Sequence, residues 1–157
     1  MAEVSQVTMV LVAVNDSPAA FAAAEVAVAF ATQLGAELRV VTVVDPASIP
    51  VDRRHTTIAS LTAERETEAG AILKHVVALG ASTGLTVTTS LRTGKIAVEI
   101  LDEARAVAAD MIVMASVDRP GHAIPKVGSH TMRVLEFASV PVLVVPGPAT
   151  HNARRRL

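Results

Sequence analysis

The sequence contains no cysteine, tryptophan or tyrosine, and only three phenylalanines among its 157 residues. The absence of cysteine excludes disulfide bonds, thiol catalysis and cysteine-ligated metal sites. The scarcity of aromatic rings removes the platforms on which unpaired bases stack, so we expect no sequence-specific binding of RNA. We accordingly predict that the protein has no nucleic-acid partner.

A strong charge of one sign is also missing, because 14 lysines and arginines nearly balance 15 aspartates and glutamates. A near-neutral chain has no broad field to attract nucleic acid or an anionic membrane. The one basic run, Arg154 to Arg156, is interpreted as part of a flexible tail over residues 150–157. The first residues lack the basic start of a signal peptide, and the apolar run at 7–14 is too short to cross a bilayer. We expect a soluble, cytoplasmic protein with no membrane partner.

Strand-like and helix-like segments alternate along the chain. Five apolar runs rich in β-branched residues predict strands buried on both faces, at residues 7–14, 37–44, 85–91, 110–115 and 140–145. Four helices are predicted between and after them, at residues 18–34, 57–82, 96–108 and 129–137. The alternation predicts a doubly wound, Rossmann-like α/β fold with a five-stranded parallel sheet and four helices. We assign residues 1–149 to one domain.

The predicted ligand site lies at the carboxyl ends of the strands, where the winding of such a sheet reverses. If the strand order is 3-2-1-4-5, the loop after the first strand faces the loop after the fourth strand. These loops begin "VNDSP" and "ASVDRPGH". The irregular connection over residues 45–57 is a lid or a plain surface loop, and the residues leave both interpretations open.

Three segments, taken in order, carry a family resemblance: "VLVAVNDSPAAFAAAEVAVAFA", "RTGKIAVEILDEARAVAADMIVMAS" and "GSHTMRVLEFASVPVLVVP". The first is similar to an opening strand, turn and Ala-rich helix. The second is similar to a Gly-containing turn, third helix and fourth strand, and the third to a Gly-Ser helix start with a closing strand. Together they resemble the universal stress protein A family over residues 7–146.

The resemblance implies a nucleotide site built on Gly, two residues, Gly, nine residues, Gly, then Ser or Thr. These positions fall on Ala115, Asp118, Gly128 and Ser129 here, so only the last two match. Side chains at glycine positions hinder the approach of backbone N–H groups to a phosphate. A carboxylate at Asp118 about 5 Å from a phosphate charge is opposed by roughly 3 kcal/mol at an effective dielectric near 20. The departures predict weak binding of ATP or none.

The same resemblance places three further residues in the candidate pocket. The family's aspartate after the first strand falls on Asn15, and its following glycine on Asp16. Val43 would contact a base through its backbone. Asp16 and Asp118 are carboxylates on facing loops that could share Mg²⁺ with a phosphate, or they are solvated turn residues. Both interpretations stay open.

The start of the last helix offers a second reason to expect an anion. Gly128 and Ser129 open the last predicted helix, and free N–H groups at a helix start favour negative charge. Ser129 is also a good N-cap, and this role alone could explain it. His130 would lie in the first turn beside the same pocket.

We predict a small, non-catalytic stress-response protein with weak or no ATP binding. Two alternatives are an ATP-binding switch or slow ATPase with a metal-assisted pocket, and an interaction module with a vestigial pocket. Ser116, Asp118 and His122 have the residue types of a hydrolytic triad but share one loop, which disfavours catalysis. The resemblance and an apolar sheet edge predict a homodimer through residues 140–145, and the alternative is a monomer whose edge is blunted by Pro141.

Overall fold

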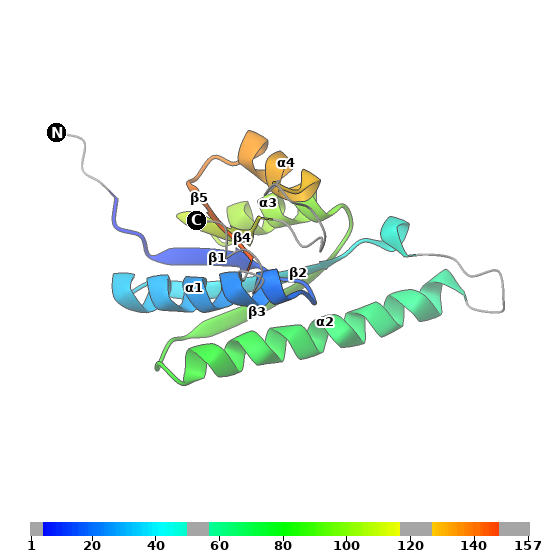
Figure 1. The fold of residues 1–157 in the computed structure, drawn as a ribbon, viewed down its shortest axis with the longest axis horizontal. Helices are drawn as coiled ribbons and strands as arrows, with labels where there is room; N and C mark the ends of the chain where they lie inside the picture. Colours follow the sequence, from blue (N-terminus) through cyan, green and yellow to red (C-terminus); the bar gives the residue numbers. More distant parts are fainter. Residues whose placement is uncertain (1–4, 50–56, 117–126, 148–157) are drawn as a thin grey trace, which may run out of the picture.

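A computed structural model of the chain describes residues 5–49, 57–116 and 127–147 (Figure 1). Five strands lie within these ranges: β1 (Met9–Ala13), β2 (Glu37–Val44), β3 (Val87–Thr93), β4 (Met111–Ala115) and β5 (Val142–Val145). All neighbours run parallel, in the order β3-β2-β1-β4-β5. The predicted fold class and strand order are confirmed, and the winding reverses between β1 and β4.

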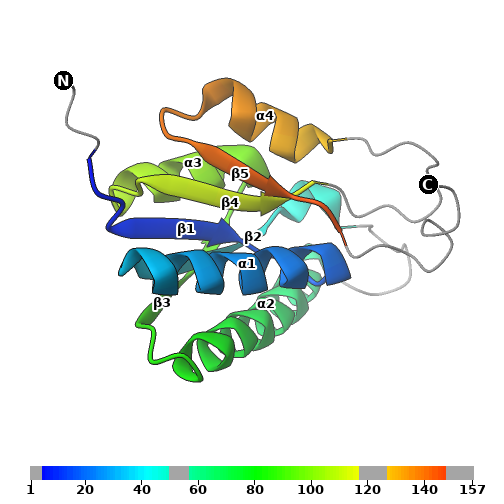
Figure 2. The same cartoon turned by 60° about the vertical axis from the view of Figure 1, so that its left-hand side comes forward.

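The strands are connected by four α-helices: α1 (Pro18–Leu34), α2 (Ile58–Ala81), α3 (Ile96–Ala106) and α4 (Ser129–Phe137). Helices α1 and α2 cover one face of the sheet, and α3 and α4 cover the other (Figures 1 and 2). The connection predicted to be irregular contains a short 3-10 helix, η1 (Pro46–Ser48). Residues 50–56 of that connection lie outside the described residues, so its role as a lid stays a prediction.

Helix α1 begins and ends where the sequence predicts. Ser17 is the N-cap, and its side chain accepts a hydrogen bond from the Ala20 N–H at 3.1 Å. Pro18 occupies the first helical position, where a backbone N–H would have no acceptor within the helix. The absence of an N–H in proline therefore costs no helical hydrogen bond. Gly35 ends the helix in the left-handed conformation with φ of 65°, which glycine adopts without strain.

The three central strands send alternate side chains into two cores. Val10, Val12 and Val40 face α1 and α2, whereas Leu11 and Val41 face α3 and α4, and all five are fully buried. A parallel sheet covered on both faces requires apolar side chains at nearly every position. For β1, β2 and β4, the prediction of strands buried on both faces is therefore confirmed.

The same prediction is wrong for the third strand. β3 runs over Val87–Thr93, two residues later than predicted, and none of its residues is buried. Leu91, for example, is 41% exposed. β3 is an edge strand, paired only with β2, and its Thr and Ser side chains are compatible with the resulting contact with water.

An ionic network fastens α3 to the β2–β3 side of the sheet. Glu103 of α3 is only 2% exposed, and its two carboxylate oxygens accept hydrogen bonds from Arg39 Nε at 2.7 Å and Arg92 Nη1 at 2.8 Å. Arg92 Nε also donates to Glu99 at 2.7 Å. Burial alone would raise the pKa of Glu103, but the hydrogen bonds from Arg39, Arg92 and Ser90 outweigh it and lower the pKa. The Glu103 carboxylate therefore stays ionised at neutral pH.

Candidate functional site

A cavity of about 560 Å³ opens at the carboxyl ends of the central strands. Helices α1 and α4 both begin at this end of the sheet (Figure 2). Six of the eight residues predicted for the pocket line this cavity: Asn15, Val43, Ala115, Gly128, Ser129 and His130. Asp16 is exposed and is not among the lining residues. Asp118 lies outside the described residues, so its predicted effect on phosphates stays a prediction, as does a magnesium site shared with Asp16.

The beginning of α4 is held against the end of β4 by two hydrogen bonds. The Gly128 N–H donates to the Ser116 carbonyl at 2.9 Å. The buried Thr131 hydroxyl donates to the Ala115 carbonyl at 3.0 Å. These two bonds hold the first residues of α4 next to the end of β4, and both segments line the cavity.

The prediction that Ser129 is the N-cap of α4 is wrong. Gly128 is the N-cap, and Ser129 is the first helical residue. Within the described residues, no side chain caps the helix start, and the first helical hydrogen bond runs from the Met132 N–H to the Gly128 carbonyl at 2.8 Å. The N–H groups of Ser129, His130 and Thr131 precede that bond, so helix geometry gives them no acceptor within α4. This end of the cavity can therefore donate hydrogen bonds to an anion.

At the opposite rim, Asn15 and Ser17 form a compact hydrogen-bonded turn before α1. The Ser17 hydroxyl donates to Asn15 Oδ1 at 2.6 Å, and the Ser17 N–H donates to the Asn15 carbonyl at 2.9 Å. Ser17 is 2% exposed, so the pair is held firmly by the fold. Asn15 itself is exposed at the cavity.

The end of β2 presents backbone to the cavity. Ala13, the last residue of β1, is paired with Val41, so β2 continues for three residues beyond its partner. The Val41 carbonyl points toward β1, because it accepts the Val14 N–H at 3.0 Å. Backbone groups two residues apart on a strand point to the same side, so those of Val43 also face the β1 side, beyond the point where β1 ends. This geometry suits the backbone contact that the family resemblance implies for Val43.

The sequence reasoning missed the apolar wall of the cavity. Val41, Ile96, Ile100 and Met114 line it together with Val43. Ile96 and Ile100 are one turn apart on α3, on the side of the helix that packs toward the sheet. Their spacing is visible in the sequence, but it also fits an ordinary helix–sheet contact, so only the packing reveals their second role.

The described lining of the cavity has a single side chain that can ionise. It contains no Asp, Glu, Lys or Arg, and His130 is its single ionisable group. In addition, the described residues hold no cluster of three or more His, Asp or Glu side chains arranged for a metal ion. The described part of the site can thus bind by hydrogen bonds and apolar contacts.

The fold and this cavity define a doubly wound α/β domain with a cavity at its switch point. The sequence matches the universal stress protein family over residues 7–146, and the chain belongs to that family. A comparison with curated protein sequences finds no match. Among the helices in the described ranges, none has the length and apolarity needed to span a membrane.

Solved structures of the family have the same fold. The universal stress protein UspA from Lactobacillus plantarum is 26% identical, with a TM-score of 0.79 over 90% of this chain and 99% of that one. A family member from Burkholderia pseudomallei is also 26% identical, with a TM-score of 0.74 over 92% and 100% of the two chains. A universal stress protein from Archaeoglobus fulgidus in complex with dAMP is 22% identical, with a TM-score of 0.64 over 90% and 99%.

Proposed function

We propose that this universal stress protein acts as a non-catalytic binding module whose cavity takes an adenine nucleotide weakly. The observation that carries the proposal is the cavity at the switch point, which combines the N–H groups that begin α4 with an apolar wall from the strands and α3. Relatives support the ligand class, because one universal stress protein was solved in complex with cAMP and another with dAMP.

The charge of the lining supports weak binding. A triphosphate is stabilised by cationic side chains or a metal, and the described lining supplies neither. A helix N-terminus adds on the order of 1 kcal/mol for an anion, which is less than one tenfold step in affinity. Asp118, aligned with a glycine of the family motif, would weaken a triphosphate further.

The chemistry of the lining also supports a role without catalysis. Hydrolysis needs a group that activates water, and His130 is the one titratable side chain among the described lining residues. Two of the three residues weighed as a triad, Asp118 and His122, lie outside the described residues. The two alternatives require more of the site. An ATP-dependent switch requires tight binding of ATP, and a slow ATPase requires hydrolysis of ATP.

Nucleotide binding can be tested on the purified chain. Native mass spectrometry with and without denaturation would detect a co-purified nucleotide, and calorimetry with ATP, ADP and AMP would give affinities. We expect no co-purified nucleotide and dissociation constants on the order of 0.1 mM or weaker, that is, less than about 6 kcal/mol of binding free energy. Co-purified ATP, or release of phosphate from ATP, would favour the alternatives.

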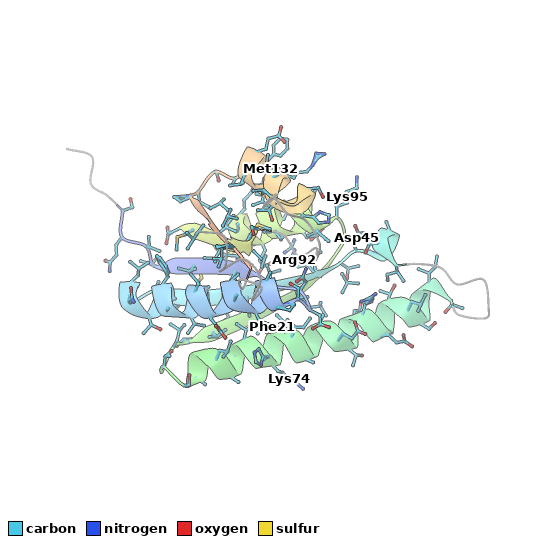
Figure 3. All side chains as sticks on the ribbon, in the orientation of Figure 1. Phe21, Asp45, Lys74, Arg92, Lys95 and Met132 are labelled. Atoms are coloured by element: carbon cyan, nitrogen blue, oxygen red, sulfur yellow. The ribbon has the colours of Figure 1, made fainter. Side chains whose placement is uncertain are left out.

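We further propose that the protein is a homodimer paired through β5. β5 is the other edge of the sheet, and its four residues, Val142–Val145, are all apolar. Met132 and Leu135 of α4 are 53% and 41% exposed, and the helix lies beside this strand (Figure 3). An unpaired apolar edge favours association with a second copy.

A proline substitution can test this interface. The Val145 carbonyl accepts the N–H of Ser116, the residue after β4, so the backbone of Val144 faces the open edge. Val144→Pro removes an outward N–H without breaking the β4–β5 pairing, and Val144→Thr is the control that keeps it. By analytical ultracentrifugation, we expect dimers for the natural chain and the Thr variant and monomers for the Pro variant. A monomeric natural chain would contradict the proposal.

A further inference from the structure

We propose that a small pocket at the amino end of the sheet binds a single-ring aromatic carboxylate. The pocket has a volume of about 160 Å³ and lies between the ends of α3 and α4 and the beginning of β5. The cavity at the switch point opens at the other end of the sheet, where α4 begins (Figure 2). Within the described ranges, the two share no lining residue, so this proposal is independent of nucleotide binding.

The pocket has a buried apolar floor and an exposed mouth. The floor is formed by residues that are at most 8% exposed, namely Leu101, Ala104, Ala109 and Ile112. Other lining residues are exposed and border the mouth, namely Arg105, Ala108, Phe137 and Ser139. A ligand can therefore enter from solvent and bury an apolar group while a polar group stays at the mouth.

The size and the walls of the pocket suit one aromatic ring. An apolar cavity of about 150 Å³ in a protein core is large enough to hold a benzene molecule. At the mouth, Phe137 is 56% exposed, although its ring is one of the largest apolar groups in the chain. A second ring that enters beside Phe137 would gain an edge-to-face or stacked contact and cover apolar surface that water now touches.

Positive charge at the mouth favours an acid over a neutral ring. Arg105 is the one charged side chain among the described lining residues. Its Nη1 donates to Asp102 at 2.5 Å, but a guanidinium has five N–H donors, so others can meet a carboxylate. Asp102 balances one positive charge, and Arg133 supplies a second, with its Cζ 5.9 Å from the centre of the Phe137 ring.

The backbone of Ala108 is strained at the edge of this pocket. Helices α1, α2 and α3 end in the same turn, in which one residue is left-handed and the next N–H donates to the carbonyl five positions earlier. The left-handed residue is Gly35 after α1 and Gly84 after α2, with φ of 65° and 72°. After α3 it is Ala108, with φ of 49°, the one non-glycine with positive φ among the described residues. Strain of this kind concentrates at ligand sites, and Ala108 lines the pocket.

Fluorine NMR with 4-fluorobenzoate tests binding to the natural chain. We expect a dissociation constant on the order of 1 mM for a ligand of about ten non-hydrogen atoms. The neutral 4-fluorobenzamide, which has the same size, should bind about threefold or more weakly. The shifted amide signals should be those of residues 104–109 and 137–140. A dissociation constant weaker than about 10 mM, equal binding of the amide, or shifts confined to residues 127–131 would overturn the proposal.

The role of Arg105 is tested by a pair of matched substitutions. Arg105→Gln should weaken 4-fluorobenzoate about threefold and leave 4-fluorobenzamide unchanged. Arg65→Gln is the control, because Arg65 forms a similar exposed pair with Glu68 on α2 and does not line the pocket. Thermal melts would verify that both variants fold like the natural chain. Equal effects of the two substitutions on 4-fluorobenzoate would contradict the proposal.

A second matched pair tests Ala108. Ala108→Gly should raise the melting temperature by about 2 to 4 °C, because the strain is relieved, and yet weaken 4-fluorobenzoate about twofold, because a methyl contact is lost. Gly35→Ala is the control in the same turn after α1, where an added Cβ meets nothing within 4 Å. It should lower the melting temperature and leave binding unchanged. An Ala108→Gly variant that binds as tightly as the natural chain would contradict the role of this residue in the pocket.

Discussion

Asp110 and Thr8, 102 positions apart in the sequence, are joined by two hydrogen bonds to one carboxylate oxygen. Asp110 Oδ2 accepts the Thr8 N–H at 2.8 Å and the Thr8 hydroxyl at 3.0 Å, and it also accepts the Met9 N–H at 3.0 Å. These bonds, the backbone bond from Thr8 foremost, lower the pKa of Asp110. One carboxylate thus aligns the beginnings of β1 and β4, the strands whose other ends border the cavity.

Removal of this carboxylate should destabilise the fold. We expect Asp110→Ala to lower the free energy of unfolding by about 2 kcal/mol, since charge-assisted hydrogen bonds to two backbone N–H groups are lost. Urea unfolding would measure the change. Asp102→Ala is the control, because the one partner of Asp102 in the described part of the chain is the exposed Arg105 one turn away, and surface pairs of this kind contribute about 0.5 kcal/mol or less. Equal effects of the two substitutions would contradict the assignment.

The Arg39–Glu103–Arg92 network predicts a loss of stability in acid. Because the folded protein lowers the pKa of Glu103, this group stabilises the fold above its unfolded pKa, about 4.3, and the contribution is lost as the pH falls through the folded pKa. Glu103→Gln should lower stability at pH 7 by about 3 kcal/mol and flatten the decline below pH 5. Unfolding curves between pH 3 and pH 7 would measure both effects. Glu68→Gln, in an exposed pair with Arg65, should change little.

Gly94, between β3 and α3, should not tolerate a side chain. Its φ is +148°, and an added Cβ would lie 2.6 Å from Oε1 of Glu99. We expect Gly94→Ala to destabilise the protein by about 2 kcal/mol, because backbone strain and displacement of Glu99 from Arg92 act together. Gly70→Ala is a matched control within α2, where a Cβ meets nothing within 4 Å. In Gly70→Ala, the higher helix propensity of alanine should raise the melting temperature. A Gly94→Ala variant more stable than the natural chain would contradict the predicted strain at Gly94.

The Thr131 hydroxyl should hold the start of α4 in place. Thr131→Val keeps the shape but removes the donor to the Ala115 carbonyl, so we expect a loss of about 1 to 2 kcal/mol. Amide hydrogen exchange should become faster at Gly128 and Met132, whose N–H groups donate to the carbonyls of Ser116 and Gly128. Thr131→Ser, which keeps the hydroxyl, should protect those amides nearly as well as threonine does. Unchanged exchange in Thr131→Val would show that the bond from the Gly128 N–H to the Ser116 carbonyl is enough to hold the start of α4 in place.

Much of the fold could be predicted because its signals are local. Ser17, Pro18 and Gly35 mark α1 through backbone chemistry that depends on few neighbours, and the apolar runs of the central strands reflect burial on both faces. The error at β3 has a different origin. Whether a strand lies at an edge is decided by the packing of the whole sheet, and an edge strand with Thr side chains still has strand propensity.

The candidate site was predictable to the extent that it follows from topology and from the family resemblance. Asn15, Ala115 and Gly128 come together because β1 and β4 are neighbours. The assignment of the cap to Ser129 was wrong because the chain enters α4 one residue earlier, and Ser and Gly both suit an N-cap. Ile96 and Ile100 could not be identified, since their spacing on α3 fits an ordinary contact between helix and sheet equally well.

The uncharged lining of the cavity also bears on how the protein responds to ionic strength. Salt at about 0.15 M screens interactions between charges over distances of about 8 Å, whereas contacts made by N–H donors and apolar walls act at short range. The described walls, with His130 as their single ionisable group, offer such contacts. Occupancy of the cavity would then follow the concentration of its ligand and change little when the salt around the protein rises or falls.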